Sequence, residues 1–294
     1  MSKEMVVYLN GEYVPRSKAK VSVFDQGILY GDGVFEGIRV YNGRIFKCQE
    51  HIDRIFYAAK AIMLEMPLTK DEFKEALKET CRRNDVKDGY IRPVVTRGVG
   101  VLGLNPKNSK VPTIFIIAAS ITLYPAEMYE KGMPIITATH RRNKATIVDP
   151  QIKSLNYLNN ILAKIEANRA GVQEALMLNH DGIVAECTGD NIFIIKDGVI
   201  ITPPIHVGIL DGITRRTVIE IAEEFGYKVV EKEFTLFNVY SADECFLTGT
   251  AAEVIPVTSV DERIIGDSGA VGPITKKLIA AFKEHTKITG EPIY

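Results

Sequence analysis

The chain has 294 residues, 46% hydrophobic and 25% charged, which is typical of a globular protein and more than one hydrophobic core usually supports, so we expect two domains. Its 36 basic residues are interspersed with 37 acidic residues, which argues against a nucleic-acid-binding surface. The four cysteines form no CxxC pair, no histidine stands at metal-ligand spacing, and no segment approaches the ~20 apolar residues of a membrane span, so we expect a cytoplasmic protein without a metal site or membrane anchor.

The first 120 residues alternate between hairpin and helix patterns. Asn-Gly stands between short apolar runs in "VVYLNGEYV" and "IRVYNGRIF", which predicts two β-hairpins. Helical spacing predicts helices over about residues 50–63 and over "TKDEFKEALKETCRRN", where Thr69 is the N-cap. "YIRPVVTRG" and "PTIFIIAASIT" follow as predicted strands. Residues 1–120 are therefore expected to form a small N-terminal α+β domain.

The periodicity is lost around "TLYPAEMYEKGMP", so residues 121–133 are expected to be an interdomain loop. Residues 134–294 then form a larger C-terminal α+β domain. Two Asp-Gly hairpins, "EALMLNHDGIVAE" and "NIFIIKDGVIITP", precede a helix in "GITRRTVIEIAEEFG", a strand, turn and strand in "ECFLTGTAAEVIPV", and a closing helix in "GPITKKLIAAFKEH". Hairpins outnumber βαβ units, so the predicted class is α+β with largely antiparallel sheets and flanking helices.

One lysine, Lys153, precedes the pattern "SLNYLNNILAKIEANRAG". The apolar spacing predicts a helix that begins just after the lysine and ends near Gly171. The helix dipole makes that end unfavourable for a cation, which favours the neutral amine needed for a Schiff base. Taken alone, a solvated surface lysine is the simpler interpretation.

Pyridoxal phosphate needs a lysine for its aldehyde, an acid for its pyridine nitrogen and an anion site for its phosphate. Glu186 ends an apolar strand, where an inward-facing carboxylate needs a partner. Backbone N–H groups at Gly212–Thr214 and in the turn at Gly249–Ala251 could bind phosphate or carboxylate. Singly, a solvated hairpin end, a helix N-cap and a plain turn explain these features equally well.

The motifs in their order resemble those of class IV (fold-type IV) pyridoxal-phosphate aminotransferases, and among them the branched-chain amino acid aminotransferases. The resemblance rests on "LYGDGVFEGIRVY", "EHIDRI", "YIRPVVTRG", "GLNP", "KSLNYLNNILAKIEA", "EALMLNHDGIVAECTGDNIF", "GITRRTVIEIA" and "FLTGTAAEVIPV". It implies the two-domain fold of D-amino acid aminotransferase and a pyridoxal 5'-phosphate cofactor. The residues it places around the cofactor are Arg54, Lys153, Tyr157, Glu186, Gly212, Ile213, Thr214, Gly249 and Thr250.

In the family's terms, Lys153 forms the Schiff base, Glu186 pairs with the pyridine nitrogen and Tyr157 binds the phenolic oxygen. Arg54 holds the phosphate with the amides of residues 213 and 214 and with Thr250. The residues that the resemblance places around the substrate are Tyr30, Phe35, Gly37, Tyr90, Arg92, Leu104, Thr250 and Ala251. Tyr30 and Leu104 reach in from a neighbouring subunit, so the expected assembly is at least a homodimer, with a trimer of dimers as a larger form.

The implied activity is transamination between leucine, isoleucine or valine and 2-oxoglutarate, giving branched 2-oxo acids and L-glutamate by a ping-pong mechanism. D-amino acid aminotransferase, (R)-amine transaminase and aminodeoxychorismate lyase share the fold and stay open as alternatives. So does a catalytically silent pyridoxal-phosphate-binding protein, although storage alone would not need a substrate-binding arginine. The chain has no tryptophan, whereas some relatives carry one on the interdomain loop.

Overall fold

The computed structural model describes residues 4–121 and 124–294, and the chain divides into two compact units. Unit 1 comprises Met1–Ile121, Ile152–Asn156 and Thr286–Tyr294, and unit 2 comprises Thr122–Gln151 and Tyr157–His285. The sequence places Lys153 in the second domain, whereas its segment packs with unit 1. Of the loop expected at 121–133, residues 122 and 123 lie outside the described residues. The remainder contains a helix, α4 (Ala126–Lys131), that the sequence did not predict.

Unit 1 is built on an eight-stranded sheet in the order β17-β5-β4-β6-β7-β1-β2, with β3 paired to β6, and the neighbouring strands are antiparallel. Both predicted Asn-Gly hairpins are present, and their turn residues have positive φ, which asparagine and glycine adopt most readily. The strands are β1 (Val6–Leu9), β2 (Glu12–Pro15), β3 (Gly33–Phe35), β4 (Ile38–Tyr41), β5 (Arg44–Ile45), β6 (Gly89–Thr96), β7 (Thr113–Ala119) and β17 (Glu291–Pro292).

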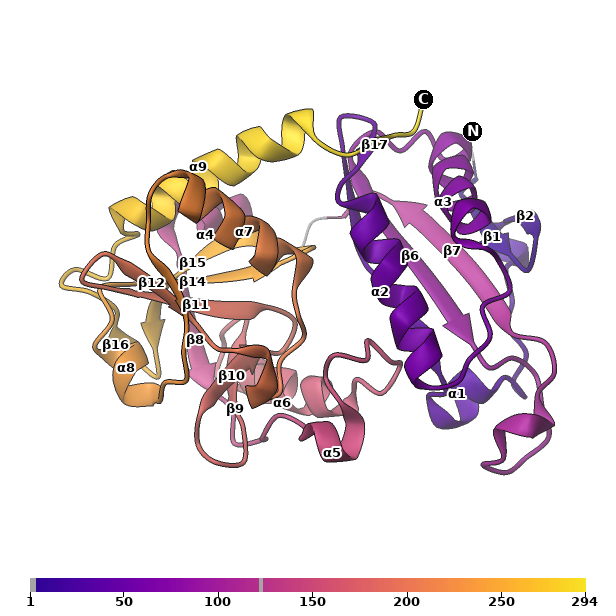
Figure 1. Ribbon diagram of the computed structural model, residues 1–294, viewed down its shortest axis with the longest axis horizontal. Coiled ribbons are helices and arrows are strands. Elements are labelled where there is room, and N and C mark those ends of the chain that lie inside the picture. Colours follow the sequence, from indigo (N-terminus) through magenta and orange to yellow (C-terminus); the bar gives the residue numbers. More distant parts are fainter. Residues whose placement is uncertain (1–3, 122–123) are drawn as a thin grey trace. The chain divides into compact units, whose positions relative to one another are not determined.

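Two helices, α2 (Cys48–Ala61) and α3 (Lys70–Arg83), lie side by side against this sheet (Figure 1). The predicted N-cap Thr69 forms a capping box with Glu72, which satisfies backbone N–H groups at the start of α3. The buried faces of both helices and of the sheet share one apolar core. The shorter elements are α1 (Gln26–Tyr30), η1 (Arg16–Lys18) and η2 (Pro106–Asn108).

Unit 2 is built on a nine-stranded sheet in the order β10-β9-β8-β15-β14-β11-β12-β13, with β16 paired to β15. The two predicted hairpins supply the antiparallel pairs β9–β10 and β11–β12, and the predicted strand, turn and strand supply β14–β15. The antiparallel pairs β11–β14 and β15–β16 were not predicted. Strand β8 runs parallel to both neighbours, and β13 runs parallel to β12, which the hairpin patterns do not predict. The strands are β8 (Met133–Thr137), β9 (Ala175–Leu178), β10 (Val184–Cys187), β11 (Asn191–Lys196), β12 (Val199–Thr202), β13 (Val229–Glu231), β14 (Glu244–Gly249), β15 (Glu253–Val260) and β16 (Arg263–Ile264).

The helices of unit 2 include α7, which packs on β14, and α4, which packs on β15 (Figure 1). Glu244 accepts hydrogen bonds from the backbone N atoms of Ile274 and Thr275 at 3.1 and 2.7 Å, and so caps α9 from the neighbouring strand. Within the described ranges, no helix is long and apolar enough to cross a membrane. The elements are α5 (Ala145–Val148), α6 (Leu158–Arg169), η3 (Ile205–Val207), α7 (Ile213–Glu224), α8 (Leu236–Tyr240) and α9 (Pro273–Ile288).

The prediction that a helix begins just after Lys153 is wrong. The helix α6 begins at Leu158, and Lys153 lies in an extended segment that forms a bridge between Ser154 and Val34. Backbone hydrogen bonds with residues 33–35 hold residues 153–155 in an extended conformation, so the helix starts only after this pairing ends. The argument from the helix dipole therefore does not apply to this lysine.

Candidate active site

Lys153 is held at both ends by unit 1. The backbone N of Phe35 donates to the carbonyl of Lys153 at 3.0 Å, and the backbone N of Leu155 donates to the carbonyl of Gly33 at 2.9 Å. The lysine Nζ lies 4.6 Å from the centroid of the Phe35 ring, where the electron-rich ring face attracts a cation. The backbone bonds hold Lys153 beside Phe35, and its Nζ lies over that ring.

Phe35 also contacts Arg92, one of the predicted substrate residues of β6. Tyr90 and Arg92 are two residues apart on this strand and so share a face. Arg92 Nη2 donates to Tyr90 Oη at 2.9 Å, and the Arg92 guanidinium lies 4.7 Å from the Phe35 ring centroid. A Cβ at Gly37 would meet Tyr90 Oη at 1.7 Å, so the hydroxyl occupies the space of a side chain there. Unit 1 thus brings Phe35, Gly37, Tyr90, Arg92 and Lys153 together.

Arg54 is fixed by a buried acid that the sequence analysis missed. Arg54 Nε and Nη2 donate to the two carboxylate oxygens of Glu36 at 2.5 and 2.9 Å, in the bidentate geometry that suits a guanidinium. The ring of buried His51 lies 2.8 Å from the same carboxylate. Burial holds the pKa of His51 below its usual value, so the neutral ring donates Nδ1–H to Glu36. Burial would raise the pKa of Glu36, but the charge of Arg54 and the hydrogen bond from His51 outweigh it and keep that pKa well below its usual range.

Tyr30 and Leu104, predicted to serve a neighbouring subunit, lie close to each other on unit 1. The backbone N of Gly103 donates to Tyr30 Oη at 2.9 Å, which ties the loop next to Leu104 to the end of α1. Both side chains are exposed, and Leu104 is 82% exposed. Both side chains are therefore available to a neighbouring molecule.

In unit 2, Glu186 is a buried carboxylate whose hydrogen-bond donors include Arg142, Asn191 and Leu210. Arg142 Nε donates to its Oε1 at 2.7 Å, and the Arg142 and Glu186 side chains are each only 6% exposed. Oε2 accepts from Asn191 Nδ2 at 3.2 Å and from the backbone N of Leu210 at 3.0 Å. A buried charge needs such partners, and they fix the position of the carboxylate.

Asn191 joins Glu186 to the start of α7. Its Nδ2 donates to the carbonyl of Leu210 at 3.0 Å, and a Cβ at Gly212 would meet its Oδ1 at 2.0 Å. The N-cap Gly212 makes no side-chain capping hydrogen bond, so the first N–H groups of α7 are not satisfied by a cap. Backbone N–H groups at a helix N-terminus, together with the helix dipole, suit a phosphate group.

The turn at Gly249–Ala251 joins β14 to β15, since Gly249 pairs with Glu253. The carboxyl of Asp190, immediately before β11, lies against this turn, because a Cβ at Gly249 would meet Asp190 Oδ1 at 1.9 Å. Asp190 and Asn191 are neighbours at the start of β11: Asp190 contacts the turn, and Asn191 binds Glu186. Tyr157, predicted to bind the cofactor, is the residue immediately before α6.

The comparison with family models decides the assignment: residues 33–260 match the model of amino-transferase class IV. The chain belongs to the class IV aminotransferase family. This confirms the family and the α+β fold class expected from the motifs.

Named relatives match nearly the whole chain. A provisionally named branched-chain-amino-acid aminotransferase of Methanocaldococcus jannaschii is 52% identical over 290 residues, covering 99% of both chains. The branched-chain-amino-acid aminotransferase of Pseudomonas aeruginosa is 41% identical over 285 residues, covering 95% of this chain and 92% of its own.

Solved structures of the same class superpose on the chain. The branched-chain amino acid aminotransferase of T.th., solved with pyridoxamine 5'-phosphate, is 40% identical, with a TM-score of 0.93 over 97% of this chain and 95% of its own. The same protein has been solved with N-(5'-phosphopyridoxyl)-L-glutamate and with 4-methylvaleric acid.

The class IV cofactor fits the residues present. The uncapped N-terminus of α7 can accept a phosphate, and Glu186 is an ionisable group fixed by three donors. In unit 1, Arg92 Nε is buried without a hydrogen-bond partner among the described residues, which leaves a guanidinium able to take a further acceptor. The features of unit 2 agree with binding of a phosphorylated, protonated ring, and Arg92 in unit 1 agrees with binding of an anionic substrate.

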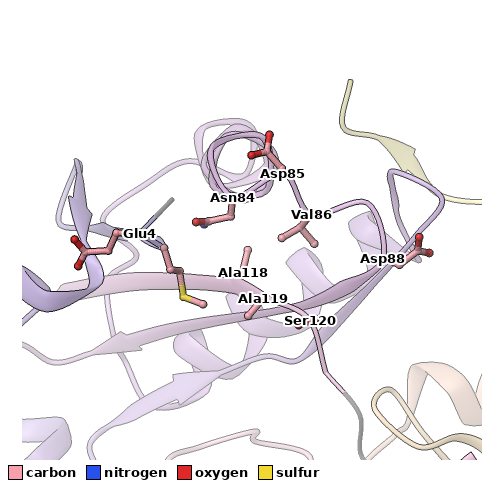
Figure 2. A pocket seen from close by; sticks show the side chains of 9 residues that line it. Glu4, Asn84, Asp85, Val86, Asp88, Ala118, Ala119 and Ser120 are labelled. Carbon is pink, nitrogen blue, oxygen red and sulfur yellow. The ribbon is translucent and has the colours of Figure 1, made fainter. Parts of the chain in front are cut away.

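A separate cavity of about 340 Å³ lies in unit 1, at the end of α3 (Figure 2). The side chains of Glu4, Asn84, Asp85 and Asp88 stand around it. Within the part of the chain that the structure describes, none of its lining residues is a predicted site residue. This cavity is not the candidate active site.

Proposed function

We propose that the chain is a pyridoxal-phosphate-dependent branched-chain amino acid aminotransferase. It moves the amino group of leucine, isoleucine or valine to 2-oxoglutarate in a ping-pong reaction. The observation that carries the proposal is the near-complete match to branched-chain aminotransferases at 52% and 41% identity. The complexes of the solved relative support the same substrates, because one bound molecule contains glutamate and another has the carbon skeleton of leucine.

Bound pyridoxal phosphate supplies an aldehyde that accepts the amino group and a ring that takes up electrons from the α-carbon. Lys153 is proposed to hold the cofactor by its Nζ and, once displaced by the substrate amine, to take the proton from the substrate's α-carbon. Glu186 keeps a proton at the ring nitrogen. Its bond to Arg142 supports this role, because the paired arginine favours the ionised carboxylate that a protonated ring needs.

The phosphate is assigned to Arg54, to Thr250 and to the backbone N–H groups of Ile213 and Thr214. The missing side-chain cap of α7 supports the last two, and the bidentate bond to Glu36 supports a fixed orientation of Arg54. Tyr157 is assigned to the cofactor's phenolic oxygen. Gly212 and Gly249 allow close approach, because a neighbouring polar side chain already fills the place of a Cβ at each.

The substrate's α-carboxylate is assigned to the amides of Thr250 and Ala251, with help from Tyr90. Arg92 is then available for the second carboxylate of glutamate, which leucine lacks. Phe35 supplies an apolar wall, supported by its contacts with Arg92 and Lys153. Gly37 makes room for the Tyr90 hydroxyl.

Tyr30 and Leu104 are proposed to complete the pocket of a neighbouring subunit, in a homodimer or a larger assembly of dimers. The exposure of both side chains, and the hydrogen bond that ties Tyr30 to the residue before Leu104, support this assignment. A cytoplasmic location is part of the same proposal, supported by four buried cysteines that are all free thiols.

A panel of L- and D-amino acids, assayed for glutamate formation with 2-oxoglutarate as acceptor, tests the function. We expect turnover of L-leucine, L-isoleucine and L-valine well above that of any D-amino acid, and none with Lys153→Ala. A preference for D-amino acids would transfer the assignment to the D-amino acid aminotransferases of the same fold. No turnover of any amino acid by cofactor-loaded protein would contradict the proposal.

A further inference from the structure

Three polar side chains are buried together in unit 2 beside the Gly249–Ala251 turn. Tyr124, Glu174 and Asp190 belong to different segments, and each side chain is shielded from solvent. The Tyr124 hydroxyl lies 3.2 Å from Asp190 Oδ2 and 3.5 Å from Glu174 Oε2. One hydroxyl therefore lies against two carboxyl groups.

The number of protons in this cluster limits its charge. A tyrosine hydroxyl has one proton and can donate it to only one of the two carboxyl groups. Two ionised carboxylates at one buried hydroxyl repel each other strongly, so the cluster is stable when one of them is protonated.

The backbone decides which carboxyl carries the proton. Glu174 Oε1 already accepts two backbone hydrogen bonds, from the N atoms of Ala175 and Thr188 at 2.7 and 3.0 Å. Burial, followed by the charge of Glu174, raises the pKa of Asp190 to about 7. Asp190 is therefore the proton carrier of the pair.

Other charged and titratable groups act on Asp190 from α6 and β10. Lys164 on α6 lowers its pKa, and Glu186 on β10, itself paired with Arg142, raises it. Cys187 on β10 donates its backbone N to the carbonyl of Asp190 at 2.7 Å, and burial holds the pKa of its thiol well above the usual value. The cysteine therefore stays neutral, and Asp190 is the group of this cluster that changes charge near neutral pH.

The Asp190 carboxyl is in direct contact with the turn. Its Oδ1 occupies the place of a Cβ on Gly249, the residue before the two amides assigned to the substrate's α-carboxylate. A protonated carboxyl supports this turn without adding charge. An ionised carboxyl places a negative charge beside amides that have to attract an anion, and the low dielectric of a buried site strengthens the repulsion.

We propose that Asp190 is a positioning residue whose proton, held with Glu174 around the Tyr124 hydroxyl, keeps the Gly249–Ala251 turn receptive to carboxylates. The proposal rests on the proposed function, which assigns this turn to the substrate's α-carboxylate. Loss of the proton weakens the binding of amino acid and 2-oxo acid alike, because both carry that group. By linkage, binding of a carboxylate raises the affinity of Asp190 for its proton by the same factor.

The test measures binding of 4-methylvaleric acid to the cofactor-loaded enzyme by calorimetry between pH 6 and pH 9. This ligand has the leucine skeleton but no amine, and its carboxyl is ionised throughout the range. We expect the wild-type Kd to rise about fivefold or more with a midpoint near pH 7, the size typical of coupled sites. The Asp190→Asn variant, which has the shape of the protonated acid and cannot ionise, should lose this pH dependence.

Two further measurements test the proposal even if the Asp190→Asn variant fails to fold. Wild-type binding at pH 7.5 should take up protons, seen as a binding heat that depends on the ionisation enthalpy of the buffer. The Glu174→Gln variant should move the midpoint to lower pH, because it removes the charge that favours the protonated form of Asp190.

The failures are distinguishable. Absence of 4-methylvaleric acid binding at pH 6 contradicts the proposed function of the site and the inference with it. Binding at pH 6 with the same pH dependence in wild type and Asp190→Asn, or an unmoved midpoint in Glu174→Gln, overturns the role of Asp190 alone.

Discussion

Replacing Arg142 with methionine should destabilise unit 2 strongly. The change removes the charge 2.7 Å from Glu186 but keeps most of the apolar length of the side chain. Both side chains are only 6% exposed, so water cannot solvate the Glu186 carboxylate in place of the lost arginine. The hydrogen bonds from Asn191 Nδ2 and from the backbone N of Leu210 remain, but neither of these donors carries a charge.

Removing one partner of a buried ion pair costs about 3–5 kcal/mol, because the other charge is left uncompensated. At about 2–4 °C per kcal/mol for a unit of this size, the Tm should fall by roughly 6–20 °C. Urea and thermal unfolding of the cofactor-free protein, followed by circular dichroism, measure this loss. The exposed pair of Lys131 and Glu127 supplies the control, and Lys131→Met should leave the transition where it is.

A double variant separates the charge effect from lost packing. Arg142→Met with Glu186→Gln should be more stable than Arg142→Met alone, because the neutral amide needs no counter-charge. A loss below about 1 kcal/mol in Arg142→Met, or a double variant as unstable as the sum of the two single changes, would refute the reasoning.

Three other predictions concern binding and pH. Arg92→Met should lower kcat/KM for glutamate more than for leucine, by an amount equivalent to an activation free energy on the order of 2–4 kcal/mol, since only glutamate has a second carboxylate. Separate half-reactions measure this, and equal losses for the two substrates would contradict it. Arg54→Ala should weaken cofactor binding, measured by equilibrium dialysis, far more than substrate binding. Arg54→Lys should restore cofactor binding only in part, because lysine cannot bond both oxygens of Glu36. An unchanged Kd for the cofactor would contradict this prediction. The folded-state pKa of Asp190, about 7, lies above its unfolded value near 3.8, so its contribution to stability is complete below about pH 4 and is lost as the pH rises towards 7. Wild type should therefore lose more stability than Asp190→Asn between pH 4 and pH 8 in urea unfolding, and parallel curves would disprove this.

Elements with a local signal could be predicted from the sequence. The Asn-Gly turns and the capping box of Thr69 are determined by neighbouring residues, so those hairpins and α3 are where the patterns place them. Strands β8, β13 and β17 carry no such signal, because each is fixed by a distant partner. The extreme case is β17, where Glu291 pairs with Ile45.

The residues of the candidate site also divide into those with a sequence signal and those without one. The motif order led to the family and to residues such as Lys153 and Glu186, whereas Glu36, Arg142 and Asn191 were missed. Their roles depend on partners far along the chain: Arg142 meets Glu186 only because unit 2 folds. A polar residue inside an apolar run, as in "VFEGI" and "GDNIFII", is the signal that could have indicated two of them. The roles of the individual site residues stay predictions.

The central claim is that Lys153 forms the Schiff base with the cofactor, and reduction of that bond tests it most directly. Borohydride reduction of the cofactor-loaded protein makes its bond to a lysine permanent, and peptide mass spectrometry then identifies that lysine. The account predicts the phosphopyridoxyl group on the peptide that contains Lys153, at close to one group per chain, and none after prior exchange of the amino group with leucine. A label on another lysine, or an unlabelled Lys153 in protein that retains bound cofactor, would contradict it.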